Sequence, residues 1–322
     1  MAYYTDFSRK TRKDQRGVEH TYEYDDVGRL TQDKVTSLGS TGLVDNYVLR
    51  IDRSYDANAR LETVTSYDVT AGTNVRNEVK YHYDGWGAVV KGYQDHDSAV
   101  DDDGQGGNDS PVVQYAWEDG AVSNVAKYAR LDYVTYPGGT ARPSVYYIYP
   151  SSGIGDALSR VETIAGASSP TDPQTFATYT YIGTGKVIQI THPASTDGSD
   201  DLLYTLGSKS DGTPYSGMDR FGRTTDAQWK VGASVKDRFQ YTYDRNSNRL
   251  TRDLTLTTGL DEKYTYDELN RLTKAERGTL SGGNIGTATF TQEWELDQLG
   301  NWDAFDQDDD GAGGSGSWEL EQ

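Results

Sequence analysis

The sequence has no cysteine, no long hydrophobic segment and no excess of basic residues. The absence of cysteine excludes disulfide bonds, thiolate metal sites and cysteine nucleophiles. No stretch approaches the roughly 18 consecutive apolar residues of a membrane-spanning helix, and Met1–Lys10 contains no apolar core of a signal peptide. The formal net charge of −19 would repel phosphate groups. We therefore expect no nucleic-acid partner and no insertion into a membrane.

Aliphatic residues are also scarce, whereas aromatic residues are abundant. Hydrophobic residues make up 34% of the chain, below the roughly 45–50% that is usual for globular domains. Few aliphatic residues together with a high net charge would by themselves favour disorder. However, the chain contains 25 tyrosines and 6 tryptophans, and this aromatic content is not typical of a disordered segment. Composition alone therefore leaves open how the chain buries its apolar surface.

A short motif recurs along the chain: Tyr-x-Tyr-Asp, followed shortly by Gly or Asn and then Arg-Leu. Five copies are close to this pattern and lie at 22–30, 53–61, 81–89, 241–250 and 264–272. Five worn copies begin at Tyr115, Tyr147, Tyr179, Met218 and Trp294. Ten copies between Asp25 and Asp297 give a period of about 30 residues, which indicates a repeat protein.

Each copy of the motif predicts a β-hairpin. Two tyrosines at positions i and i+2 lie on one face of a strand. The Asp can accept hydrogen bonds from backbone N–H groups two residues on, Gly or Asn supplies a positive φ, and Arg-Leu begins the return strand. Connections rich in Gly, Ser, Thr, Pro and Asp separate the copies, and no long stretch has helical periodicity.

These features predict an all-β chain of tandem hairpins that form a curved or spiralling, open antiparallel sheet, a partial shell. A β-sandwich of unrelated hairpins would not repeat one turn signature. A four-stranded propeller blade needs roughly 40–45 residues, which is more than the period provides. In such a ribbon each repeat buries a strip against its neighbours, and tyrosine suits this because its hydroxyl can reach water or backbone.

The pattern Tyr-x-Tyr-Asp-x-x-Gly-Arg-Leu resembles the YD repeat of the Rhs family. That family includes bacterial Rhs polymorphic toxins, wall-associated proteins, the C component of insecticidal toxin complexes and animal teneurins. The resemblance covers about Tyr22 to Trp302. It implies a hairpin ribbon that spirals into a hollow shell, which encloses a C-terminal toxic domain in toxin members and is an extracellular scaffold in others. It also implies structural roles for the turn residues Asp25, Gly28, Asp244 and Asp267.

The sequence departs from the family in three ways. It has no Rhs core signature rich in Pro and Asp-Pro-Gly, so the carboxylate pair that releases the toxin has no counterpart. No toxin domain follows the repeats, and the chain ends at Gln322 within the pattern. We therefore expect a YD-repeat ribbon at 1–302, and at 303–322 an acidic Gly/Ser-rich tail or truncated next repeat. The expected partners are neighbouring repeats or domains of a larger parent chain, or an enclosed toxin domain, at an extracellular or cell-surface location.

Few residues suggest chemistry. The histidines His20, His82, His96 and His192 form no Ser-His-Asp set and no pair at metal spacing, and we interpret them as surface residues. Asp306, Asp308, Asp310 and Gly311 match the start of a calcium loop, but Ser317 occupies the position of its bidentate Glu, and Glu319 falls two residues late. A solvated acidic loop is the favoured interpretation, with calcium binding left open.

A second acidic loop contains Asp95, Asp97, Asp101, Asp102 and Asp103, with spacing less typical of a cation site. We therefore predict no catalytic, cofactor-binding or metal-binding residues, no cofactor, and a non-enzymatic structural scaffold. The main alternative is an adhesion or carbohydrate-binding module, because exposed Tyr and Trp can stack on sugars. A carboxylate-dependent hydrolase would need two acids of raised pKa in one cleft, and no spacing points to such a pair.

Overall fold

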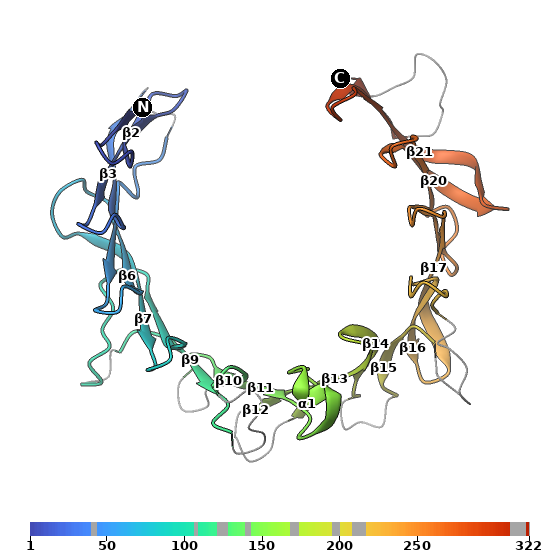
Figure 1. The fold of residues 1–322 in the computed structure, drawn as a ribbon, viewed down its shortest axis with the longest axis horizontal. Helices are drawn as coiled ribbons and strands as arrows, with labels where there is room; N and C mark the ends of the chain where they lie inside the picture. The colour runs from blue at the N-terminus through green and yellow to red at the C-terminus, as the bar shows by residue number, and fades with distance from the viewer. Residues whose placement is uncertain are drawn as a thin grey trace. The chain divides into compact units, whose positions relative to one another are not determined.

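The computed structural model describes residues 1–39, 44–105, 109–120, 128–138, 143–167, 174–194, 200–207, 217–309 and 320–321. The chain forms two compact units, Met1–Gln174 and Thr175–Gln322. In Figure 1 the first unit is coloured from blue to green and the second from green to red. No helix in the described part of the chain is long and apolar enough to cross a membrane.

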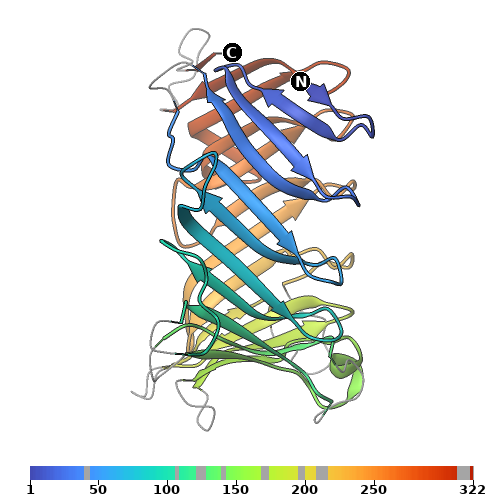
Figure 2. The same ribbon diagram turned by 90° about the vertical axis from the view of Figure 1, so that its left-hand side faces the viewer.

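The first unit is an antiparallel sheet in which each strand pairs with its neighbours in the sequence. Figure 2 shows its strands side by side, with the connections alternating between the two ends of the strands. The pairings run without a crossover from β1 to β12. The elements are β1 (Ala2–Tyr3), β2 (Arg9–Lys13), β3 (Val18–Tyr24), β4 (Leu30–Leu38), β5 (Arg50–Tyr55), β6 (Leu61–Tyr67), β7 (Val75–Tyr83), β8 (Val89–Asp95), β9 (Val112–Trp117), β10 (Leu131–Thr135), β11 (Ser144–Ile148), α1 (Gly153–Ala157) and β12 (Thr163–Ala167).

The second unit repeats this arrangement, and β13 begins at the last residue of the first unit. Its strands also pair only with their neighbours among the described pairings. They are β13 (Gln174–Ile182), β14 (Lys186–His192), β15 (Leu202–Thr205), β16 (Asp226–Val231), β17 (Ser234–Tyr243), β18 (Arg249–Leu254), β19 (Asp261–Tyr266), β20 (Leu272–Ser281), β21 (Asn284–Leu296), β22 (Trp302–Asp308) and β23 (Leu320–Glu321).

The predicted fold class is confirmed: in the described ranges the regular elements apart from α1 are strands, and these form consecutive antiparallel hairpins. Among the described pairings, β1 pairs only with β2 and β23 only with β22, so neither unit closes on itself. The sequence boundary at 302/303 falls inside β22, because that strand runs to Asp308 and pairs with β21.

The turns of the motif share one geometry. The backbone N–H of Asp25 donates to the carbonyl of Arg29 at 3.0 Å, and the N–H of Gly28 donates to the carbonyl of Asp25 at 2.9 Å. The residue three positions after the Asp has positive φ, which is 84° at Gly28, 66° at Ala59 and 62° at Asn270. The predicted turn is therefore confirmed, although its left-handed position also accepts Ala, which pays a conformational cost there.

One copy is aligned differently from the sequence prediction. In the turn after Tyr243, the positive φ of 71° belongs to Ser247 and not to Asn248. Asn248 occupies the place of Arg29, since its backbone N–H donates to Asp244 Oδ1 at 2.8 Å. The assignment of Asn248 to the glycine position was wrong by one residue, because residue type does not by itself identify the left-handed position.

A β-bulge recurs where each motif tyrosine meets the turn. Tyr24 pairs with Leu30 whereas Glu23 pairs with Gln32, which leaves Thr31 as an extra residue on the return strand. Equivalent shifts in register precede Tyr55, Tyr83, Tyr181, Tyr243 and Tyr266. A bulge bends its strand and increases the local twist. Each of these hairpins therefore has a bend at the same point of its motif.

The described residues contain few fully buried apolar side chains. The buried cluster Ile188, Leu206 and Ala227 lies in the second unit, with Tyr204 and Met218 packed against it. In the first unit the buried apolar residues are spread over several strands, with Val18 and Tyr22 on β3, Tyr93 on β8, Val112 on β9 and Val134 on β10. All nine residues of β7 are half-buried. This pattern is expected of a sheet that buries strips between neighbouring repeats.

Candidate functional site

The aspartate of the motif is fixed by its own turn. Asp25 Oδ1 accepts hydrogen bonds from the backbone N–H groups of Val27 at 3.1 Å and Arg29 at 2.9 Å, and its Oδ2 accepts one from Arg29 Nε at 2.7 Å. Asp56 and Asp267 make the same set of bonds to their own turns. The backbone N–H four residues on is the largest cause that lowers the pKa of these three aspartates. The predicted structural role of the turn aspartates is thus given a mechanism.

The arginine of the motif also connects each hairpin to the next. The guanidinium of Arg60 lies 4.4 Å from the ring centroid of Tyr83, and its Nη1 donates to the carbonyl of Asp84 at 3.0 Å. In return, the hydroxyl of Tyr83 donates to the carbonyl of Leu61 at 2.6 Å. We call this set of contacts between consecutive hairpins the repeat clasp.

The repeat clasp recurs in both units. In the first unit, Arg29 stacks at 4.3 Å on the ring of Tyr55, whose hydroxyl donates to Leu30 at 2.9 Å. In the second unit, Arg223 stacks at 4.7 Å on the ring of Tyr243 and donates to the carbonyl of Asp244 at 2.9 Å. A polar side chain of one repeat is therefore satisfied by the backbone of the next repeat, which makes neighbouring hairpins interdependent.

A worn copy retains the repeat clasp in a buried form. Glu118 occupies the place of the motif aspartate, because its N–H donates to the carbonyl of Arg130 at 2.9 Å. Arg130 is 3% exposed, lies 5.1 Å from the ring centroid of Tyr149, and pairs with Asp156 Oδ1 at 2.8 Å and Glu118 Oε2 at 3.9 Å. The hydroxyl of Tyr149 donates to the carbonyl of Leu131 at 3.1 Å. Insertions into these two turns, one of which carries α1, leave the clasp in place.

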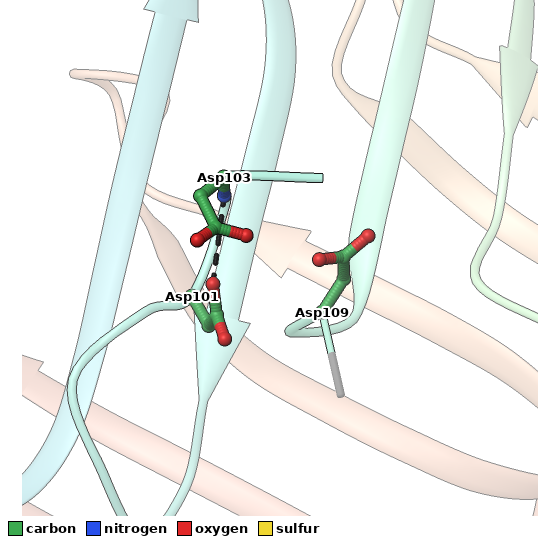
Figure 3. Close-up of side chains that lie close together, drawn as sticks. All are labelled: Asp101, Asp103 and Asp109. Atoms are coloured by element: carbon green, nitrogen blue, oxygen red, sulfur yellow. Dashed lines mark hydrogen bonds between the residues drawn. The ribbon is translucent and has the colours of Figure 1, made fainter. Parts of the chain in front are cut away.

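The acidic segment after β8 brings three carboxylates together. Asp101, Asp103 and Asp109 each offer an oxygen, and these oxygens lie within 4.8 Å of one another (Figure 3). Carboxylate oxygens are the ligands that calcium takes. All three residues are exposed, and exposed acidic groups commonly gather in this way without an ion. The sequence analysis singled out Asp101 and Asp103 but not Asp109, which belongs to the same connection between β8 and β9.

The other aspartates of this segment fasten the loop. Asp102 accepts hydrogen bonds from Lys80 Nζ at 2.9 Å and pairs with His82 Nε2 at 2.7 Å. The hydrogen bond from Lys80 is the largest cause that lowers the pKa of Asp102. Asp95 accepts a hydrogen bond at 3.1 Å from the backbone N–H of Asp97. The interpretation of this segment as a solvated loop was therefore incomplete, because the side chains of Lys80 and His82 in β7 hold it against the sheet.

The acidic residues near the end of the chain lie in a strand. Asp306 and Asp308 belong to β22 and pair in register with Glu293 and Thr291 of β21. Asp308 is 2% exposed. Asp310, the third residue of the predicted calcium pattern, lies outside the described residues. Both sequence interpretations placed Asp306 and Asp308 in a loop and were wrong on this point, because β22 continues past the predicted boundary.

The histidines have separate partners. His20 Nδ1 lies 2.7 Å from Asp33 Oδ1, and His192 Nδ1 lies 3.0 Å from the carbonyl of Phe176. His96 Nδ1 lies 3.3 Å from Asn77 Nδ2, whereas His82 pairs with the acidic loop. The two histidines that are close in sequence therefore do not share a partner.

A cavity of about 500 Å³ lies beside the buried clasp. Its walls include the aromatic side chains of Trp117, Tyr147 and Tyr149, and it is also lined by the acids Glu118, Asp119 and Asp132. We call it the aromatic–acid basin. It was not predicted from the sequence, because Glu118 and Asp119 follow β9 whereas Asp132 lies on β10, and the pairing of these two strands brings them together. Two features of the sequence could have indicated this cavity: Glu118 stands where the motif has Asp, and a long insertion follows it.

Comparison with known proteins identifies the fold. No family model and no curated protein sequence matches the chain. Among the solved structures that match are those of TcdB2-TccC3-TEV and TcdB2-TccC3-Cdc42, each over 94% of this chain with 12% sequence identity and a TM-score of 0.50. At this identity the similarity shows the fold alone. The chain spans 16% of the length of the chains it matches.

Proposed function

We propose that the chain is a segment of an Rhs/YD-repeat shell or scaffold in a larger protein, with a structural and not an enzymatic role. The repeat clasp is the observation that carries this proposal. Three residue types that recur in this chain's repeats, Tyr, Asp and Arg, form the turns and connect one hairpin to the next. Residues with these roles stabilise a continuous sheet, and the same repeat clasp can continue into further repeats at either end.

The structural similarity supports the same proposal at the level of the fold. The matched TcdB2-TccC3 chains are much longer than this one, which covers 16% of them. The family that the motif resembles includes the C component of insecticidal toxin complexes. In such a parent protein, the partners of this segment would be adjacent repeats and an enclosed polypeptide, in a secreted or cell-surface setting.

The test examines the native protein. An antibody raised against this chain should detect a polypeptide much heavier than 35.6 kDa in extracts of the source cells. Limited proteolysis of that native protein should leave a further segment, outside the repeats, intact until the protein is denatured. A native product of 35.6 kDa would overturn the proposal, and a heavy product without a protected segment would favour an open surface scaffold.

Carbohydrate binding is the second candidate function, and one observation favours it. Trp86 lies at a turn, is 77% exposed and stacks on Tyr128 with ring centroids 5.8 Å apart. An exposed indole of this kind can stack on a sugar ring. A glycan array should then give a signal that Trp86→Ala abolishes. An array without signal above background would count against this candidate.

A further inference from the structure

The aromatic–acid basin arises from a bulge that carries an acid. Trp117 pairs with Leu131 and Ala116 pairs with Tyr133, so Asp132 is the extra residue on β10. This is the position of Thr31 in the first hairpin. On the other side of β10, Tyr133 pairs with Tyr146 of β11. The next residues in this register are Asp132 and Tyr147, and both line the cavity.

One carboxylate of the basin, that of Asp132, has no cation as a partner in the described part of the chain. Glu118 has Arg130 as a partner at 3.9 Å. No hydrogen bond or ion pair joins Asp132 to any residue in the described part of the chain. Desolvation, followed by the charges of Glu118 and Asp119, raises the pKa of Asp132. A positive charge placed in the cavity beside Asp132 would therefore be attracted by this carboxylate.

The aromatic walls leave ring surface for a ligand. The polar end of Trp117 is used, since its Nε1 donates to the carbonyl of Val89 at 2.9 Å, and the hydroxyl of Tyr149 is bonded to the backbone of β10. What these residues offer the cavity is therefore aromatic carbon. The electron-rich face of an aromatic ring attracts cations, and alkylated ammonium groups use this attraction because they are weakly hydrated.

We propose that the aromatic–acid basin binds a small organic cation with an alkylated ammonium head group. Each competing ligand class would use only part of the site. A metal ion would use the carboxylate oxygens and gain little from the rings, whereas a neutral sugar would use the rings and gain nothing from the charge. An alkylammonium ion uses both. A cavity of about 500 Å³ is also large enough for a choline-sized molecule.

The first experiment titrates choline chloride into the 322-residue chain and follows binding by calorimetry and by the fluorescence of tryptophan. We expect a dissociation constant on the order of 1 mM, as for a shallow site that holds a few heavy atoms. The neutral isostere 3,3-dimethylbutan-1-ol should bind at least about tenfold more weakly. Equal binding of the isostere, or tight binding of calcium chloride that excludes choline, would overturn the proposal.

Variants locate the site. Asp132→Asn and Tyr147→Leu should each weaken choline binding about tenfold. The matched controls are Asp303→Asn, at the extra residue of the equivalent bulge in the last full hairpin, and Tyr146→Leu, next to the cavity on the same strand, and both should leave binding unchanged. Equal losses in the two aspartate variants would mean nonspecific attraction to an acidic protein and would overturn the proposal.

A folding defect does not obscure the result. Asp132→Asn keeps the shape of the side chain, and Tyr147→Phe keeps the ring, so Tyr147→Phe should bind choline with unchanged affinity if Tyr147→Leu fails to fold. Choline binding should also weaken as the pH falls through the raised pKa of Asp132, because protonation removes the charge that attracts the cation. Affinity that is constant from pH 7 to pH 4 would contradict the role of Asp132.

Discussion

The buried repeat clasp around Arg130 gives the sharpest test of the structure. The side chain of Arg130 is 2% exposed, and those of its partners Asp156 and Glu118 are 8% and 10% exposed. Its Nε also donates to Ser159 Oγ at 3.1 Å. Arg130→Met keeps much of the apolar stem but removes the charge. Since breaking a buried ion pair from one side leaves buried charge behind, the variant should lose about 3–5 kcal/mol of stability at pH 7.

Stability has to be measured for the affected hairpins as well as for the whole chain. Repeat proteins unfold through interactions between neighbours, so urea unfolding monitored by circular dichroism need not be two-state. Hydrogen exchange at the amides of β9, β10 and β11 reports opening of the affected hairpins directly. The comparison variant is Arg60→Met, whose guanidinium forms the same clasp with a side chain that is 25% exposed. Its loss should be clearly smaller, because water screens the charges that remain.

A second substitution separates charge from packing. Asp156→Asn removes one of the carboxylates that Arg130→Met leaves unbalanced, so it should cost clearly less stability in the Arg130→Met background than in the unchanged protein. A loss of less than about 1 kcal/mol at pH 7 would refute the assignment of this clasp as a buried ion pair. Equal costs of Asp156→Asn in the two backgrounds would show that lost packing, and not lost charge, is responsible.

Three further predictions follow from the turns and the clasp. Tyr83→Phe removes the hydroxyl of the clasp and should cost about 1 kcal/mol in urea unfolding, whereas Tyr81→Phe, whose hydroxyl has no partner among the described residues, should change stability by less than about 0.5 kcal/mol. Gly28→Ala, at φ 84°, should destabilise by about 1 kcal/mol, and Ala59→Gly, at φ 66°, should be neutral or stabilising, as thermal midpoints would show; the reverse order would contradict the turn geometry. The lowered pKa of Asp267 means that its stabilising contribution is complete above the ordinary aspartate value of 3.8 and is lost as the pH falls through the lower folded value. Unfolding midpoints between pH 6 and pH 2 should therefore fall less steeply in Asp267→Asn, and parallel curves would refute this.

The sequence predicted the parts of the fold that depend on local chemistry. Asp, Gly and the alternating tyrosines specify a turn and its flanking strands within a few residues, so the hairpins could be found one by one. The second function of the motif arginine was not predicted, because the ring of Tyr83 and the carbonyl of Asp84 lie a full repeat away from Arg60. The recurrence of an arginine four residues after the Asp, at Arg29, Arg60, Arg223 and Arg271, was the available signal.

The aromatic–acid basin could not be predicted for a related reason. Asp132 becomes prominent only because a bulge makes it the extra residue of β10, and neither the bulge nor the pairing with Trp117 is visible in the residue types. The strand at Asp306 and Asp308 was missed because a row of acids is typical of a loop, whereas here the neighbouring strand β21 supplies backbone partners that override the local preference.

The repeat clasp has a consequence for how such a chain can change over time. Its contacts connect the tyrosine at the end of one hairpin's first strand to the start of the return strand in the preceding hairpin. None of these contacts depends on how many residues lie between that tyrosine and its turn. Tyr149 and Arg130 remain in the clasp although α1 is inserted after Tyr149, and Asp156 of the inserted helix itself pairs with Arg130. The entropic cost of closing a loop grows slowly with its length. The turn after the motif tyrosine can therefore accept an insertion. New binding segments can be added there while the wall keeps its register.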